Sequence, residues 1–128
     1  MFTLDQIDEI HNTLGKRASI PEYLQALNAI GVIRYDSFIT DGHSEYYGAD
    51  NHKLVSPPVH EAYVIAEISN LEALHIHLKL HEQGETDYFQ MSQGLADSGV
   101  EKWTFDTEQM TIAYYDKAGN ELLVEEIH

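Results

Sequence analysis

The sequence predicts an α+β protein in which an antiparallel sheet packs against helices, with one helix-helix-strand-strand-strand unit present twice. Three observations predict this class. Apolar residues recur at helical spacing in four stretches, an alternation with period two follows each pair of those stretches, and a few positions match the residue 68 places further along. At 128 residues the chain fits one domain, 1–128, with pseudo-repeats at about 1–58 and 69–128 and a connecting segment at 59–68.

Two helices are predicted before the first strand. Thr3 and Gln6 form a capping-box pattern, and apolar residues then recur at helical spacing, so we expect an amphipathic helix over residues 4–14. Ser19 is the predicted start of a second helix, and Gly31 is its predicted end.

From residue 32 the period changes to two, which indicates a hairpin. Asp41-Gly42 predicts a two-residue turn that places Phe38 opposite Glu45 and Asp36 opposite Tyr47. We expect the core to contact the set Ile33, Tyr35, Ser37, Ile39, Ser44 and Tyr46. The opposite face then carries Arg34, Asp36, Phe38, Thr40, His43, Glu45 and Tyr47. Residues 52–56 are a candidate third strand, closed by two prolines.

The second half is predicted to follow the same order. The apolar segment 59–68 favours a strand, although its length does not exclude a helix. Ser69 with Glu72 predicts a helix to about residue 83, and Thr86 or Asp87 predicts another to about residue 98, which Gly99 ends.

An ungapped shift of 68 residues supports a duplication. It superposes Leu27 on Leu95, Gly31-Val32 on Gly99-Val100, Arg34 on Lys102, Tyr35 on Trp103 and Tyr46-Tyr47 on Tyr114-Tyr115. Because 68 is even, the shift preserves strand faces. The second hairpin has no counterpart of Gly42, so we expect a longer loop around residues 107–109. Coincidental matching is the alternative interpretation.

The charge and composition exclude several classes. The chain has 22 acidic and 7 basic side chains, a formal charge of −15, which disfavours nucleic acid and suits a basic protein partner or a solubilising surface. There is no cysteine, no signal-like start and no run of about 18 apolar residues, so we expect a cytoplasmic protein without membrane contact.

Several strings resemble a known family. They are Thr40-Asp41-Gly42-His43, Gly48-Ala49-Asp50, Gly99-Val100-Glu101-Lys102-Trp103 and Tyr114-Tyr115-Asp116-Lys117-Ala118-Gly119-Asn120-Glu121. Along its whole length the chain resembles the short bacterial, often prophage-borne proteins labelled "phage envelope protein", a domain of unknown function. The resemblance implies a bacterial cytoplasmic accessory protein. It carries no catalytic residues over to this chain.

The candidate binding residues lie on the predicted outer sheet face. Arg34 is expected diagonal to Tyr47, and Lys102 near Tyr115. A cation packed on a tyrosine ring can hold an anionic small molecule or a partner's carboxylate, and such pairs also simply stabilise sheets.

Candidate chemistry is sparse elsewhere. His77 and His81 lie at i, i+4 on one predicted helix, the spacing of a metal-binding pair, but the stretch lacks the glutamate of a zinc-protease motif, and histidines edging a packed helix are the alternative. Asp41, His43 and Ser44 include triad residue types, but neighbours on a strand point to alternate faces. Asp36 and Glu45 are a possible carboxylate pair on one face.

We therefore predict no cofactor and a non-enzymatic binding or accessory protein, phage-related, that engages a protein partner. The alternative is a small-molecule or metal-binding domain with hydrolytic activity that uses His77, His81 and nearby tyrosines. A self-associating structural protein is the third interpretation, since an open sheet has exposed edge strands.

Overall fold

The computed structural model describes residues 2–14 and 20–127. Within these ranges the chain forms helices and strands in the order α1 (Leu4–Leu14), α2 (Ile20–Ala29), β1 (Arg34–Phe38), β2 (Ser44–Tyr47), the 3-10 helix η1 (Ala49–Asn51), β3 (Lys53–Val55), α3 (Leu71–Glu82), α4 (Tyr88–Asp97), β4 (Lys102–Asp106), β5 (Thr111–Tyr115) and β6 (Glu121–Glu126). The predicted α+β class is confirmed. None of the described helices combines the length and the apolar character that a membrane crossing needs.

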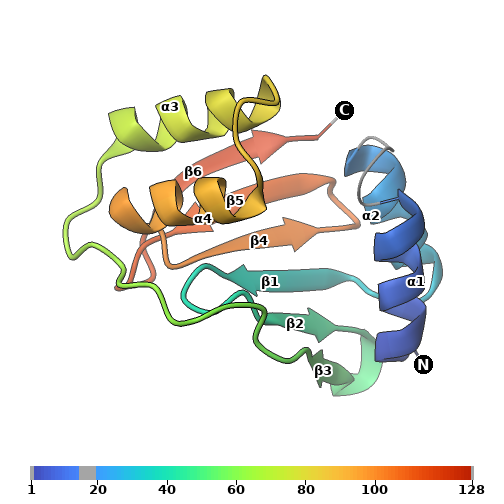
Figure 1. The fold of residues 1–128 in the computed structure, drawn as a ribbon. Coiled ribbons are helices and arrows are strands. Elements are labelled where there is room, and N and C mark those ends of the chain that lie inside the picture. The colour runs from blue at the N-terminus through green and yellow to red at the C-terminus, as the bar shows by residue number, and fades with distance from the viewer. Residues whose placement is uncertain (1, 15–19, 128) are drawn as a thin grey trace.

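The strands form one six-stranded sheet in the order β3-β2-β1-β4-β5-β6, and every neighbouring pair is antiparallel (Figure 1). The two hairpin systems join through β1 and β4, where Asp36 lies opposite Thr104. These two residues are 68 positions apart. β1 therefore pairs with β4, the strand that the shift of 68 residues superposes on it. The duplication itself stays a prediction.

The two-residue turn predicted at Asp41-Gly42 is wrong, and the register differs by two residues. Arg34 pairs with Tyr47 and Asp36 with Glu45, because the connection runs from residue 39 to residue 43. The longer connection is held from outside the hairpin: the Asp41 carbonyl accepts hydrogen bonds from the amides of Val59 and His60. A shift of two preserves the faces, so the predicted division into inner and outer side chains holds.

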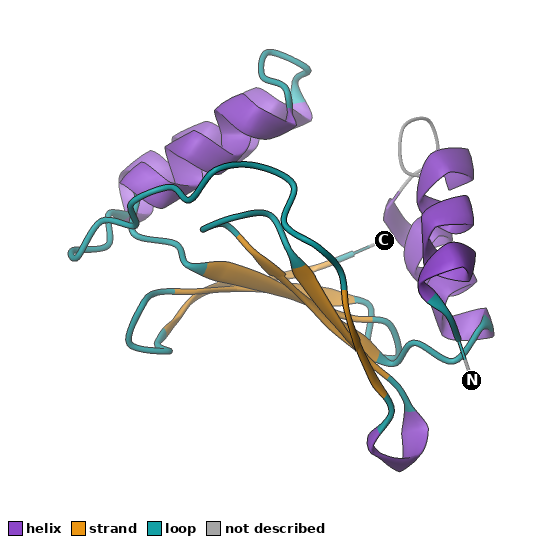
Figure 2. Ribbon diagram, turned by 60° about the horizontal axis from the view of Figure 1, so that its bottom comes forward, coloured by secondary structure: helices purple, strands orange, loops and turns teal. Residues whose placement is uncertain are grey.

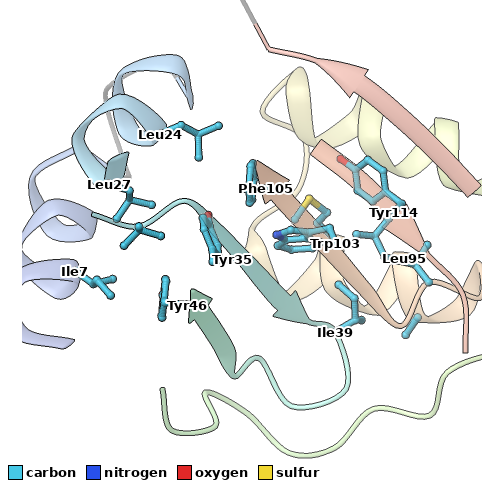
Figure 3. Packing of buried hydrophobic residues seen from close by; sticks show 14 of the residues in the cluster. Ile7, Leu24, Leu27, Tyr35, Ile39, Tyr46, Leu95, Trp103, Phe105 and Tyr114 are labelled. Carbon is cyan, nitrogen blue, oxygen red and sulfur yellow. The ribbon is translucent and has the colours of Figure 1, made fainter. Parts of the chain in front are cut away.

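One face of the sheet is covered and forms the core. Both helix pairs lie on this side, α3 with α4 and α1 with α2 (Figure 2). The strands contribute Tyr35, Tyr46, Trp103, Phe105 and Tyr114, and the helices contribute Ile7, Leu24, Leu27 and Leu95 (Figure 3). Leu74 of α3 belongs to the same cluster. Tyr35 stacks on Phe105 with ring centroids 4.8 Å apart, which joins the two halves of the core. Of the predicted inner set, Ile33 alone is not buried, with an exposed fraction of 36%.

The helix ends follow local sequence. Thr3 and Gln6 exchange hydrogen bonds as a capping box before α1, and Asp87 and Gln90 do so before α4. The cap of α3 is Asn70, whose side chain accepts from the Ala73 amide, and not the predicted Ser69. The predicted start of the second helix at Ser19 lies outside the described residues.

The segment 59–68 is not a strand, contrary to the prediction. It forms no helix either, and runs as an extended connection across the helix-covered side of the sheet (Figure 1). Ile65 is buried and anchors it, while the Ala66 amide bonds the Ala96 carbonyl at the end of α4. The third strand is also shorter than predicted, at residues 53–55.

Candidate functional site

The second face of the sheet is not covered by any of the described helices and is the candidate site. We call it the open face; strand register places on it Arg34, Asp36, Phe38, Glu45, Tyr47, Lys53, Val55, Lys102, Thr104, Asp106, Thr111, Ala113 and Tyr115. Alternation along each strand separates this set from the core. The open face therefore displays charged and aromatic side chains on a rigid sheet.

Three cations on this face, the predicted Arg34 and Lys102 together with Lys53, each lie over an aromatic ring. The Arg34 guanidinium carbon is 4.3 Å from the centroid of the Tyr47 ring, and the Lys53 ammonium is 5.5 Å from the same centroid. Arg34 and Tyr47 are direct cross-strand partners and not diagonal neighbours as predicted. The geometry is that of a cation–π contact.

The second half repeats part of this arrangement. The Lys102 ammonium lies 5.4 Å from the centroid of Tyr115, its direct cross-strand partner, and 5.7 Å from that of Phe38. The predicted position of Lys102 near Tyr115, matching that of Arg34 near Tyr47, is confirmed. Whether either pair binds a ligand stays a prediction.

Asp36 is a buried carboxylate at the centre of the open face. Its side chain is 7% exposed, accepts a hydrogen bond of 2.7 Å from the Thr104 hydroxyl and lies 3.6 Å from the Lys102 ammonium. Glu45 is its cross-strand partner, so the two carboxylates that the sequence suggested are neighbours. Each bonds a different set of donors, which is the arrangement of a structural network.

A row of ionisable side chains runs along β2 and the turn before it. We call Asp41, His43, Glu45, Tyr47 and Lys53 the His43 network. The two ring nitrogens of His43 lie 2.5 Å from an Asp41 oxygen and 3.2 Å from a Glu45 oxygen. Glu45 also accepts a hydrogen bond of 2.9 Å from the Tyr47 hydroxyl and lies 3.2 Å from the Lys53 ammonium. Phe38 stacks on the His43 ring, with centroids 4.4 Å apart.

The network shifts the pKa values of its members. Burial acts to lower the pKa of His43, but the hydrogen bonds of its ring to Asp41 and Glu45 outweigh burial, so the pKa lies above its usual value. Burial acts to raise the pKa of Asp41, but hydrogen bonds from His43 outweigh burial and lower this pKa. Burial also acts to raise the pKa of Glu45, but hydrogen bonds from Tyr47 and then from His43 outweigh it, so this pKa is lowered too. The row thus favours a protonated histidine between two ionised carboxylates.

Sequence reasoning missed this network, although its signal is visible. His43, Glu45 and Tyr47 alternate with period two, which places them on one face, and Asp41 in the turn before them accepts a hydrogen bond from the His43 amide. Ser44 is buried on the covered face, so it does not join Asp41 and His43 as a nucleophile. With both ring nitrogens of His43 facing carboxylates, the arrangement serves as an electrostatic brace and not as a catalytic triad.

A shallow groove adjoins the stacked arginine. Its volume is about 350 Å³, and it is lined by Ile33, Arg34, Tyr47, Asp106, Glu108 and Gln109. Among the described side chains no carboxylate lies within ion-pair distance of the Arg34 guanidinium. The N–H donors of the guanidinium are therefore not paired with a carboxylate of the described residues and can bind an acceptor of a partner.

His77 and His81, the predicted metal pair, have different neighbours. The His77 ring packs against Gly94 of α4 so closely that a Cβ there would collide with it. The His81 ring nitrogen lies 3.1 Å from the carbonyl oxygen of Thr86, in the loop that follows α3. Within residues 2–14 and 20–127, no group of three or more histidine, aspartate or glutamate side chains is placed to hold a metal ion.

Together these features define a class: an α+β protein whose antiparallel sheet carries helices on one side and a charged, aromatic surface on the other. A family model described as "Protein of unknown function (DUF1398)" matches residues 8–126. The chain belongs to this family. No curated protein matches the chain.

Proposed function

We propose that this is a non-enzymatic binding protein that docks a protein partner on the open face of its sheet. One observation carries the proposal: a chain of net charge −15 places three of its seven basic residues, Arg34, Lys53 and Lys102, on this one face, each against an aromatic ring. Arginine and tyrosine are enriched where proteins bind one another, because they bring large rigid area together with hydrogen-bonding ends.

The side chains of this face are held in place before any partner arrives. Tyr47 is half-buried, and its hydroxyl bonds Glu45, while Lys102 is held between two rings and Asp36. Less side-chain entropy is then lost on binding, which favours affinity. The groove beside Arg34 supplies a position for a partner's carboxylate, to which the guanidinium donates two parallel hydrogen bonds.

The setting is part of the same proposal. The resemblance to proteins labelled "phage envelope protein" supports a bacterial cytoplasmic role beside a phage or prophage factor, and the partner would then be a phage or host protein.

The test is affinity capture from a bacterial lysate with quantification by mass spectrometry. The tagged wild-type protein is compared with the open-face variant Arg34→Ala/Tyr47→Ala and with the control variant Lys79→Ala, which removes a cation from α3. We expect one or more proteins to be captured by wild type and by the control, and to fall at least about tenfold with the open-face variant.

The fluorescence of Trp103, the single tryptophan, checks that each variant is folded. The proposal is overturned if the open-face variant recovers every captured protein as well as wild type does. It is also overturned if nothing rises above the background of the tag alone.

A further inference from the structure

A second surface lies on the opposite side of the sheet, between the segment 62–68 and α4. It is a groove of about 520 Å³ lined by Ala62, Tyr63, Val64, Ala66, Gln93 and Asp97. The groove belongs to neither the open face nor the His43 network.

Apart from Glu67, the segment 62–68 is apolar on both of its sides. Ile65 is buried in the core and Tyr63 packs against the core. The intervening side chains point outward, and Val64 and Ile68 are 86% and 83% exposed. Alternation normally gives an extended segment one polar side when that side faces water. An apolar row on both sides is the pattern of a segment that is covered on both sides.

The backbone of this segment is also open to a partner. The Tyr63 amide bonds the Thr40 carbonyl, and the Ala66 amide bonds the Ala96 carbonyl. Between them, the amide and carbonyl of Val64 have no hydrogen-bond partner among the described residues. Extended chain with unpaired backbone groups accepts a further strand, whose alternate side chains then meet the apolar row.

The charges around the groove select the occupant. The segment 59–69 contains Glu61 and Glu67 and no lysine or arginine, and α4 contains Asp97 and no lysine or arginine. Among the described residues one cation reaches the segment from outside: the Lys117 ammonium lies 2.7 Å from a Glu67 carboxylate oxygen. A second copy of this chain would bring the same carboxylates together, so its approach is repelled.

We propose that this groove binds an extended segment of another protein in which apolar and basic side chains alternate. The apolar side chains cover Val64 and Ile68, and the basic ones face Asp97 and Glu61. This inference is independent of the proposed function, because the two surfaces lie on opposite sides of the sheet.

The probe is a fluorescent eight-residue peptide that alternates lysine and valine, with both ends blocked. Two control peptides replace every valine by serine or every lysine by glutamate. Binding is followed by fluorescence anisotropy with wild type, with Val64→Ser/Ile68→Ser and with the matched control Val124→Ser on β6. Nuclear magnetic resonance of the labelled protein then locates the bound peptide.

We expect the lysine–valine peptide to bind at least about tenfold more tightly than either control peptide. The double variant should lose at least about tenfold in affinity, and Val124→Ser should lose none. Amide signals should move most at Ala62, Val64, Ala66 and Gln93.

Equal binding of the lysine–serine peptide, or an unchanged affinity of the double variant, would overturn the inference, because attraction to net charge alone would then explain binding. Sedimentation of the free protein tests the other occupant. A dimer that Val64→Ser/Ile68→Ser abolishes would assign the groove to a second copy and also overturn it.

Discussion

The two halves of the molecule share their framework and differ in what they display. β1 and β2 correspond in position to β4 and β5, and in both halves a cation on the first strand packs on a tyrosine directly opposite, Arg34 on Tyr47 and Lys102 on Tyr115. The His43 network occurs in the first half alone. Sixty-eight residues further on, His43 and Glu45 are replaced by Thr111 and Ala113.

This difference separates architecture from candidate function. Buried residues that recur in both halves, such as Leu27 and Leu95, hold the sheet and its helices together, and one explanation covers both. Residues present in one half need a separate explanation, and for the His43 network that explanation is local bracing of the open face where Arg34 and Tyr47 lie.

The largest expected effect tests whether the two halves contribute equally to the core. Leu27 and Leu95 are 68 positions apart and both are fully buried. We expect Leu27→Ala and Leu95→Ala each to lower the free energy of unfolding by about 3 kcal/mol, and by similar amounts. Urea titration followed by Trp103 fluorescence measures this. Leu71→Ala, at an exposed position of α3, is the control and should change stability by less than about 0.5 kcal/mol. A difference above about 2 kcal/mol between the two core variants would break the equivalence.

The glycines after α2 and α4 should respond differently to the same substitution. Gly31 and Gly99 both have positive φ, 104° and 89°, so alanine is strained at either position. A Cβ at Gly99 would also come within 2.7 Å of the Ser69 Cα, whereas a Cβ at Gly31 would meet Phe2 at 3.8 Å.

We expect Gly31→Ala to cost about 1–2 kcal/mol and Gly99→Ala at least about 1 kcal/mol more. Thermal unfolding of both variants decides the order. If Gly31→Ala instead cost more stability than Gly99→Ala, the backbone at Ser69 must move to make room for the new methyl group.

A smaller, pH-dependent effect is expected from His43. Its folded pKa is raised, so its stabilising contribution is complete below the ordinary pKa of about 6.5 and is lost as the pH rises through the folded pKa. The pKa values of Asp41 and Glu45 are lowered, so their contribution is present above about 4 and is lost as the pH falls through their folded values.

His43→Gln should therefore lower stability more at pH 5.5 than at pH 9, by about 1 kcal/mol. Thermal unfolding across this range measures the difference. Thr111→Ala, the matched position in the second half, should show no such dependence. If His43→Gln lowers stability by the same amount at every pH, the ion pairs of His43 with Asp41 and Glu45 do not stabilise the fold. The loss would then come from the stacking of His43 on Phe38 alone.

Local chemistry made much of this fold predictable. The capping box at Thr3, the cap at Asp87 and the glycines after each helical pair mark helix ends through short-range hydrogen bonds and backbone conformation. Period-two alternation assigned faces correctly even though the register was off by two. The turn itself depends on contacts with Val59 and His60, which no local pattern encodes.

The rest depended on partners distant in sequence. Strand order follows from which edges meet, and the pairing of Asp36 with Thr104 joins residues 68 positions apart. The segment 59–68 looked like a strand because its apolar residues alternate, but no strand of the described chain pairs with it. The burial of Asp36 likewise depends on Thr104 and Lys102 from the other half.

The binding role of the open face can be tested directly because the chain contains no cysteine. Val55→Cys on β3 lies on the open face opposite Glu45, and Lys79→Cys lies on α3, so a bulky maleimide polymer can be attached to either side of the sheet. Capture of the partner from lysate is then measured for both labelled proteins. We predict that the label at residue 55 abolishes capture and that the label at residue 79 leaves it unchanged. Undiminished capture by the protein labelled at residue 55 would contradict docking on the open face.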